Sequence, residues 1–173
     1  MSRFYGNRRN GFTALEIVVV LMIMSIFSTF AILSYKSYKK QARLRSAAQT
    51  LQSTLSTARM LAINQNTNFQ VRIDINNGNF WIDRLDGSGR IVKPKVTGVN
   101  WLPDDVLFTE VQKNGISVYS GIIPILFRAN STSEYTSIYI VGANTDTSVG
   151  ENYFTIRIYP STGLAHTYKN QRK

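Results

Sequence analysis

The sequence contains no cysteine and only one histidine, His166. The absence of cysteine excludes a disulfide framework, a thiolate metal site and a Cys–His nucleophile pair. A Ser–His–Asp triad would have to use His166, an isolated residue near the C-terminal tail that is interpreted as a surface side chain. Composition therefore argues against an enzyme, and neither a catalytic residue nor a cofactor is predicted.

The clustered acidic residues suit loops better than a catalytic or metal site. Asp104 and Asp105 follow a proline, which is typical of a solvated loop. The segment from Asp74 to Asn79 resembles the start of a calcium loop, but its twelfth position is Leu85, where an EF-hand requires a bidentate glutamate. A hairpin turn explains this segment better, so no metal site is predicted.

Glycine and proline are both absent between Phe12 and Ile63. Because these two residues are the usual helix breakers, one continuous helix of about fifty residues is predicted. Its first part is an apolar run from Ile17 to Leu33, interrupted only by three hydroxyl-bearing residues. From Phe12 to Leu33 a helix would extend for about 33 Å, enough to cross a hydrocarbon core of about 30 Å. A membrane-spanning segment is therefore predicted over residues 12–34.

The second part of the predicted helix, residues 35–63, is amphipathic. Apolar side chains recur there at spacings of three and four residues, and polar side chains lie between them. One face of this half should therefore pack on a soluble domain. The residues of that face are Leu44, Ala47, Ala48, Leu51, Leu55, Ala58, Leu61 and Ala62.

From residue 64 to residue 173 the pattern becomes that of β-strands. Apolar and polar residues alternate, and the segments are bounded by Asn, Gly and Pro turns such as Asn76–Asn79. The last four strands are predicted to form one continuous antiparallel sheet, with Gly142–Asn152 as an exposed loop. The fold class is therefore α+β, with the long N-terminal helix covering a sheet. The predicted strands are Phe69–Ile75, Phe80–Leu85, Ile91–Val99, Val106–Val111, Ile116–Tyr119, Ile122–Phe127, Thr136–Val141, Tyr153–Tyr159 and Leu164–Tyr168.

The chain carries a formal net charge of +10. Two interpretations of this excess are open. Five basic residues after the apolar run could lie just outside a membrane and contact acidic lipid headgroups. Alternatively, Lys169, Arg172 and Lys173 at the C-terminus, or Arg90, Lys93 and Lys95, could form a nucleic-acid patch, which is the less favoured interpretation. The five residues after the run are Lys36, Lys39, Lys40, Arg43 and Arg45.

A short motif stands at the head of the apolar run. Two arginines precede Gly11-Phe12-Thr13, and a single carboxylate, Glu16, follows four residues after Phe12. An ionisable group at the edge of a membrane-length helix is a functional candidate by default. This motif resembles the class III signal of type IV pilins and of type II secretion pseudopilins.

The resemblance implies a processing route and a set of partners. A prepilin peptidase would cut after Gly11 on the cytoplasmic side and methylate the new amino group of Phe12. Glu16 would pair with the Phe12 amine of a neighbouring subunit as a filament assembles, which neutralises two charges where neither can be solvated. Other pilins or pseudopilins and an inner-membrane assembly platform would be further partners. Removal of Arg3, Arg8 and Arg9 with the leader, residues 1–11, would leave 17 basic against 10 acidic residues, a charge of +7.

Later segments are similar to minor pseudopilins of the H type, the GspH/FimT-like group. Asn130-Ser131 departs from this pattern, since the group tends to place glycine there. Unlike many major pilins, the chain also has no proline in the membrane half of its helix. The matching segments are Arg59-x-Leu61-Ala62-Ile63, the Phe-Val-Ile strand from Phe69, Leu126-Phe127-Arg128 before Thr132, and Ile156-Arg157-Ile158 with Thr162-Gly163.

The sequence therefore predicts a pilin-like minor pseudopilin of a type II secretion system, held in the bacterial inner membrane by one span with residues 64–173 in the periplasm or outside. A minor type IV pilin acting in pilus biogenesis, adhesion or DNA uptake is the main alternative. A secreted β-rich binding domain is a third, with Ile17–Met24 as the core of a signal peptide cleaved near Ala31. Charge counting alone favours the opposite orientation in the membrane, so the leader motif decides the predicted topology.

Overall fold

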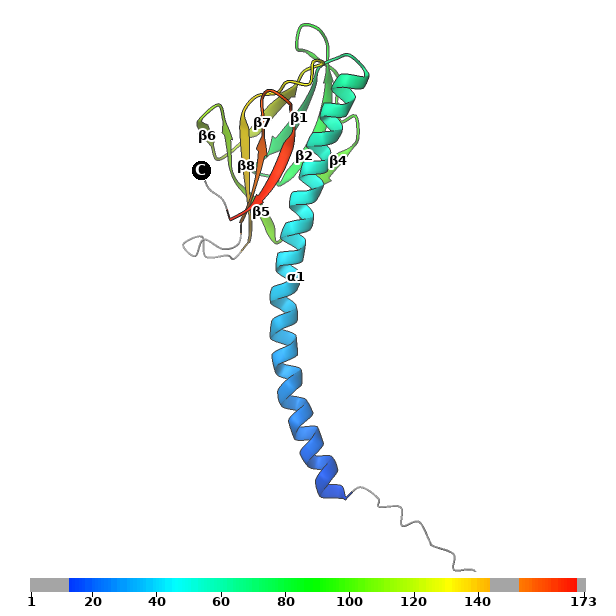
Figure 1. The fold of residues 1–173 in the computed structure, drawn as a ribbon, viewed down its shortest axis with the longest axis vertical. Helices are drawn as coiled ribbons and strands as arrows, with labels where there is room; N and C mark the ends of the chain where they lie inside the picture. The colour runs from blue at the N-terminus through cyan, green and yellow to red at the C-terminus, as the bar shows by residue number, and fades with distance from the viewer. Residues whose placement is uncertain (1–12, 144–152, 171–173) are drawn as a thin grey trace, which may run out of the picture. The chain divides into compact units, whose positions relative to one another are not determined.

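The computed structural model describes residues 13–143 and 153–170, apart from the side chains of residues 29–34 and 36–37. The chain divides into two compact units, Met1–Tyr38 and Lys39–Lys173. One helix, α1 (Ala14–Asn64), begins in the first unit and ends in the second. It is followed by ten strands, all in the second unit (Figure 1). The predicted α+β class and the predicted continuous helix are both confirmed.

The C-terminal end of α1 is set by local hydrogen bonds. Asn66 adopts a positive φ of 47°, and its N–H donates to the Ile63 carbonyl at 3.2 Å. The N–H of Thr67 donates to the Ala62 carbonyl at 3.1 Å. This pair of bonds is the Schellman arrangement, which satisfies carbonyls that the last turn would otherwise leave unpaired. The asparagine-rich segment after residue 63 thus ends the helix where the sequence predicts.

The second half of α1 packs on the strands through the predicted face. Of the eight residues predicted for it, seven are buried, and Leu61 is partly buried against the same core. Figure 1 shows this half, in cyan and blue-green, running along the strands of the second unit. The core also contains large side chains from both sheets, such as Phe69, Phe80 and Ile156.

The first sheet has the order β3-β2-β1-β7, and β4 also pairs with β2. Its central hairpin turns through the predicted Asn76–Asn79 segment, where Gly78 has a φ of 65°. The Asp74 carboxylate accepts hydrogen bonds from the N–H groups of Asn76 and Asn77, each at 3.1 Å. Asp74 therefore stabilises the turn, as the hairpin interpretation requires. The strands are β1 (Phe69–Asp74), β2 (Asn79–Leu85), β3 (Ile91–Lys93), β4 (Val99–Trp101) and β7 (Ile122–Phe127).

The second sheet has the order β10-β9-β8-β5-β6, and all its pairings are antiparallel. Its inward side chains, including Ile138, Ile140 and Ile158, join the core that α1 covers. The strands are β5 (Val106–Lys113), β6 (Ile116–Val118), β8 (Thr136–Gly142), β9 (Tyr153–Ile158) and β10 (Ala165–Lys169).

Two sequence predictions about the sheets are wrong. The last four strands do not form one continuous sheet, because β7 pairs with β1 of the first sheet, with Phe127 opposite Phe69. The single strand predicted over Ile91–Val99 is divided into β3 and β4. Between these strands Pro94 offers no N–H, and Lys95 and Gly98 adopt positive φ values of 50° and 82°, which are incompatible with an extended strand. The loop predicted over Gly142–Asn152 lies largely outside the described residues.

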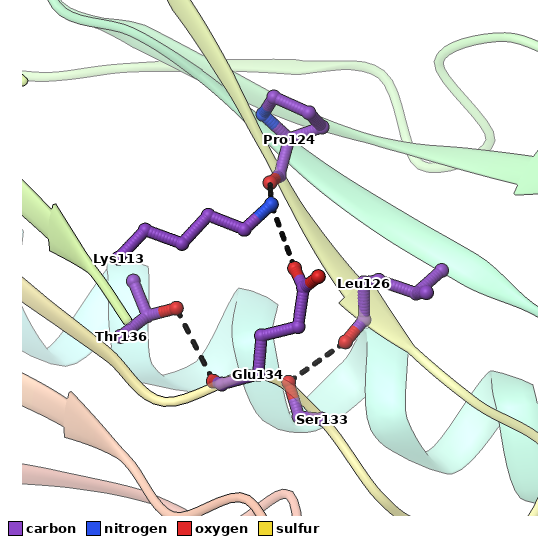
Figure 2. A network of polar contacts seen from close by, with 6 residues as sticks. All are labelled: Lys113, Pro124, Leu126, Ser133, Glu134 and Thr136. Atoms are coloured by element: carbon purple, nitrogen blue, oxygen red, sulfur yellow. Dashed lines mark hydrogen bonds and ion pairs between the residues drawn. The ribbon is translucent and has the colours of Figure 1, made fainter. Parts of the chain in front are cut away.

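A lysine connects the two sheets where the chain passes from one to the other. Lys113 Nζ, at the end of β5, lies 2.7 Å from a Glu134 carboxylate oxygen and donates to the Pro124 carbonyl of β7 at 3.0 Å. Figure 2 shows this ammonium between its two acceptors, with Ser133 donating to the Leu126 carbonyl beside it. These bonds occupy two carbonyls of β7 on the side away from β1. The open edge of β7 is thus covered by side chains.

Polar side chains of α1 also hold two turns and the edge strand of the second sheet. Arg59 Nε donates to the Thr162 carbonyl at 2.6 Å and to Ser131 Oγ at 3.1 Å, and Ser131 Oγ donates to the same carbonyl at 3.0 Å. Gly163, next along the chain, lies against the Arg59 side chain. Nearer the N-terminus of the helix than Arg59, Gln52 Nε2 donates to the Ala165 carbonyl of β10 at 2.9 Å. We call the group Arg59, Ser131, Thr162 and Gly163 the arginine latch.

Candidate functional site

The first turn of α1 carries Glu16, the predicted assembly residue. The helix is capped by Thr13, whose Oγ1 accepts a hydrogen bond from the Glu16 N–H at 3.2 Å, while the Thr13 carbonyl accepts from Ile17 at 3.3 Å. Thr13 and Glu16 stand in the spacing of a capping box, in which a hydroxyl and an acid share the first turn. A carboxylate at this position is also stabilised by the positive end of the helix dipole. Gly11 and Phe12, the other two predicted site residues, lie outside the described residues.

The Glu16 carboxylate is available for an external partner. It is exposed, and it forms no hydrogen bond or ion pair with any residue that the structure describes. It is also the only acidic residue before Asp74, so the whole of α1 contains one negative charge. Within the described part of the chain, the charge of Glu16 is therefore not offset by a contacting cation.

Large apolar side chains follow Glu16 on every side of the helix. Because they include an uninterrupted run of consecutive residues, they cannot all face one side of a helix with 3.6 residues per turn. A helix that is apolar all round is normally buried in a protein core or in a membrane. Among the side chains that the structure describes, no stretch of helix is both long and apolar enough to cross a membrane. The exposed side chains are Leu15, Ile17, Val18, Val19, Val20, Leu21, Met22, Ile23, Met24, Ile26 and Phe27.

The predicted span over residues 12–34 reaches beyond this described part. Phe12 and the side chains of residues 29–34 lie outside it. What the structure describes is therefore an apolar helical surface that begins one residue before Glu16 and is not covered by any described residue of its own unit. Such a surface can associate with lipid or with the same surface on other chains.

Four of the five basic residues after the apolar run have described side chains, and they fall into two groups; the side chain of Lys36 lies outside the described part. Arg43 Nη1 lies 3.4 Å from the Asp105 carboxylate. Asp105, one of the two acids predicted to lie in a solvated loop, therefore forms an ion pair with a residue of α1. Lys39, Lys40 and Arg45 are exposed, and they form no ion pair within the described residues. The sequence did not predict the Arg43–Asp105 pair, because nothing local to either residue indicates the other.

The predicted C-terminal basic patch is described only in part. Lys169 is exposed at the end of β10, whereas Arg172 and Lys173 lie outside the described residues. Beside it, the guanidinium of Arg157 lies 5.4 Å from the ring centre of Tyr168. A hydrogen bond of 2.8 Å between the hydroxyls of Tyr168 and Tyr159, together with burial, raises the pKa of Tyr168. The described residues do not assemble three cations at this place.

Other candidate residues do not converge on a reaction site. His166 is exposed, and its ring contacts Tyr159 edge to face, with centroids 5.7 Å apart. Asp74 is occupied by its own turn, and Asp105 by Arg43. Over residues 13–143 and 153–170, no group of three or more histidine or acidic side chains is placed to hold a metal ion.

Comparison with known proteins relates the fold to solved structures. No family model and no curated protein matches the sequence. The minor pseudopilin EpsH from the type II secretion system of Vibrio cholerae matches with a TM-score of 0.59 and 13% identity, over 77% of this chain and 98% of that chain. The type IV minor pilin FimU of Pseudomonas aeruginosa matches with a TM-score of 0.55 and 17% identity, over 78% and 95%. GspH of E. coli matches with a TM-score of 0.54 and 12% identity, over 75% and 90%.

These similarities concern the fold. At such identities they show that the chain has the pilin-like fold of GspH-type minor pseudopilins and of minor pilins, as the sequence resemblance implies.

Proposed function

We propose that this chain is a structural subunit of a pilus-like filament, and specifically a minor pseudopilin of a type II secretion system. The observation that carries the proposal is the exposed apolar surface from Leu15 to Phe27 with one acid, Glu16, at its head, on a pilin-like fold. A filament provides the missing cover for this surface, since the same surface of other subunits can pack against it. The chain acts by making contacts and has no catalytic role.

The N-terminal motif supplies the chemistry of assembly. Cleavage after Gly11 by a prepilin peptidase releases the Phe12 amine, which is then methylated. The amine of one subunit pairs with Glu16 of its neighbour, and each charge gains a partner where water is excluded. Before assembly the chain lies in the bacterial inner membrane with one span over residues 12–34. The leader is then on the cytoplasmic side, next to the assembly platform, and the second unit lies in the periplasm.

Secretion is preferred over a pilus as the system served. Support comes from the similarity to EpsH, a minor pseudopilin of a type II secretion system, with 98% of its length matched. The second candidate, a minor type IV pilin, is favoured by the somewhat higher identity to FimU, 17% against 13% and 12%. Fold similarity of this degree supports a filament subunit more strongly than it supports either system.

Deletion of the gene in the bacterium that encodes it tests this proposal. We expect secreted enzyme activity in the culture supernatant to fall by about tenfold or more, because the pseudopilus cannot be built without a required subunit. Twitching motility should stay unchanged, and the wild-type gene should restore secretion. Loss of twitching with normal secretion would favour the minor type IV pilin instead. Normal secretion and twitching, with the chain absent from sheared filaments, would contradict the filament proposal.

A further inference from the structure

A belt of positive charge surrounds α1 at the start of the second unit. Lys39, Lys40 and Arg45 are exposed there, and none of the three forms a hydrogen bond or an ion pair with any described residue. Arg43 lies among them but is held at 3.4 Å by Asp105. The chain contains no acid between residues 17 and 73 that could neutralise the belt. We call Lys39, Lys40 and Arg45 the basic collar.

The positions of the collar residues around the helix indicate the shape of the partner. At about 100° per residue, the angle from Lys39 to Lys40 is about 100°, from Lys40 to Arg45 about 140°, and from Arg45 back to Lys39 about 120°. The three cations therefore point to three different sides of the helix axis. A folded partner that docks on one side would contact one or two of them, whereas a layer of anionic groups around the helix can contact all three.

Two tyrosines that precede the basic collar in the sequence also suit a membrane–water interface. Tyr35 and Tyr38 are 64% and 72% exposed. Tyrosine is enriched where a helix passes through the membrane–water interface, because its ring is apolar and its hydroxyl is polar. Lysine and arginine at such places extend their long side chains to reach the headgroups. Before these tyrosines comes the exposed apolar surface that ends, in the described part, at Phe27.

We propose that the basic collar binds the phosphate groups of anionic phospholipids, such as phosphatidylglycerol, and fixes the depth of α1 in the bilayer surface. The inference rests on the membrane contact in the proposed function and adds a lipid class and its binding residues. Arg43 is not part of the collar, because its pairing with Asp105 directs it to the folded domain. Lipid phosphates carry the negative charge that neutralises the cations of the collar, and they surround a helix on all sides.

Native mass spectrometry of the full chain tests the collar. The protein is released from nanodiscs that contain equal amounts of phosphatidylglycerol and phosphatidylcholine, and the lipids retained on each chain are counted. Wild-type chain should retain phosphatidylglycerol in clear excess. Each basic residue near a membrane surface contributes about a fivefold preference, so K39Q/K40Q/R45Q should lower the excess by up to about a hundredfold.

The matched control is R84Q/R90Q/K93Q, which removes three exposed positive charges from another part of the second unit. It should retain the wild-type lipid excess, and unchanged circular dichroism should show that both triple variants are folded. Equal loss in the two variants would overturn the collar, because general charge attraction would then explain the binding. Insertion without a preference for phosphatidylglycerol would overturn the collar alone. A chain that fails to enter nanodiscs would overturn both the collar and the proposed function.

Discussion

Replacement of Glu16 by alanine is expected to remove the chain from filaments while leaving it in the membrane. The acid is the only negative charge of α1, it has no partner among the described residues, and it stands at the head of an exposed apolar run. In the assembled filament its loss would leave the Phe12 amine of the next subunit buried without a counter-charge, which costs about 3–5 kcal/mol. That corresponds to at least about a hundredfold less chain in the sheared filament fraction relative to the membrane fraction.

Two further variants separate charge from shape. E16Q keeps the size of the side chain and should fail as E16A does, because the amide cannot neutralise an ammonium group. D104N removes an exposed carboxylate from a loop of the second unit and should assemble normally. Loss of the favourable interaction between the Glu16 carboxylate and the helix dipole accounts for only about 1 kcal/mol and cannot produce the expected defect. Wild-type incorporation of E16A would contradict the proposed role of the carboxylate.

Replacement of Gly163 by alanine is expected to destabilise the second unit by about 2–4 kcal/mol. Gly163 has a φ of 61°, and a Cβ there would lie 2.6 Å from the Ser131 carbonyl oxygen and 3.3 Å from Arg59 Cδ. The left-handed backbone alone costs about 1–2 kcal/mol for a residue with a side chain. Relief of the overlap would also move a backbone carbonyl of the arginine latch. Thermal unfolding of the full chain, followed by circular dichroism, should show a midpoint lower by about 10 °C.

Gly87 provides the matched control for this substitution. A Cβ at Gly87 meets nothing within 4 Å, and the backbone there does not adopt a positive φ. G87A should therefore change stability by less than about 1 kcal/mol, and a small gain is the expected direction because alanine restricts the unfolded chain. Equal midpoints for G163A and G87A would show that the latch does not require glycine at position 163.

Helix α1 could be predicted from the sequence because its signals are local. No glycine or proline interrupts it, and the spacing of Leu44, Leu51 and Leu55 fixes the face that is buried. The asparagines after residue 63 mark its end. Hairpin β1–β2 was predictable for the same reason, since Gly78 and its neighbours specify the turn.

Strand partners could not be predicted in the same way. Alternation of apolar and polar residues tells which side of a strand is buried, but it does not tell which strand lies beside it. The pairing of Phe127 with Phe69 joins segments far apart in the sequence, and the prediction of one continuous sheet failed at that point. The side chains that cover the edge of β7, such as Lys113, come from the other sheet.

The polar residues show the same difference between local signals, which could be predicted from the sequence, and long-range contacts, which could not. Glu16 was predicted as a site residue from a motif in which the spacing to Gly11 and Phe12 carries the information, and its role stays a prediction. The contacts of Arg59 with Ser131 and Thr162 could not be found this way, because the partners lie 72 and 103 residues away. Arg43 and Asp105 are likewise separated by 62 residues, so their pairing could not be predicted from the sequence. The basic residues of α1 could therefore be counted from the sequence, but not divided into paired and unpaired groups.

The mass of the mature chain recovered from sheared filaments is the most direct test of the central proposal. Intact mass and N-terminal fragmentation should show a chain that begins at Phe12 and carries a methyl group on its amine. The Phe12 amine would then stand at the start of the helix that bears Glu16. Each mature subunit would carry both of the charges that the proposed pairing between neighbouring subunits requires. A mature chain that begins near Ile32 would contradict the account, because the apolar surface and Glu16 would then belong to a discarded signal peptide.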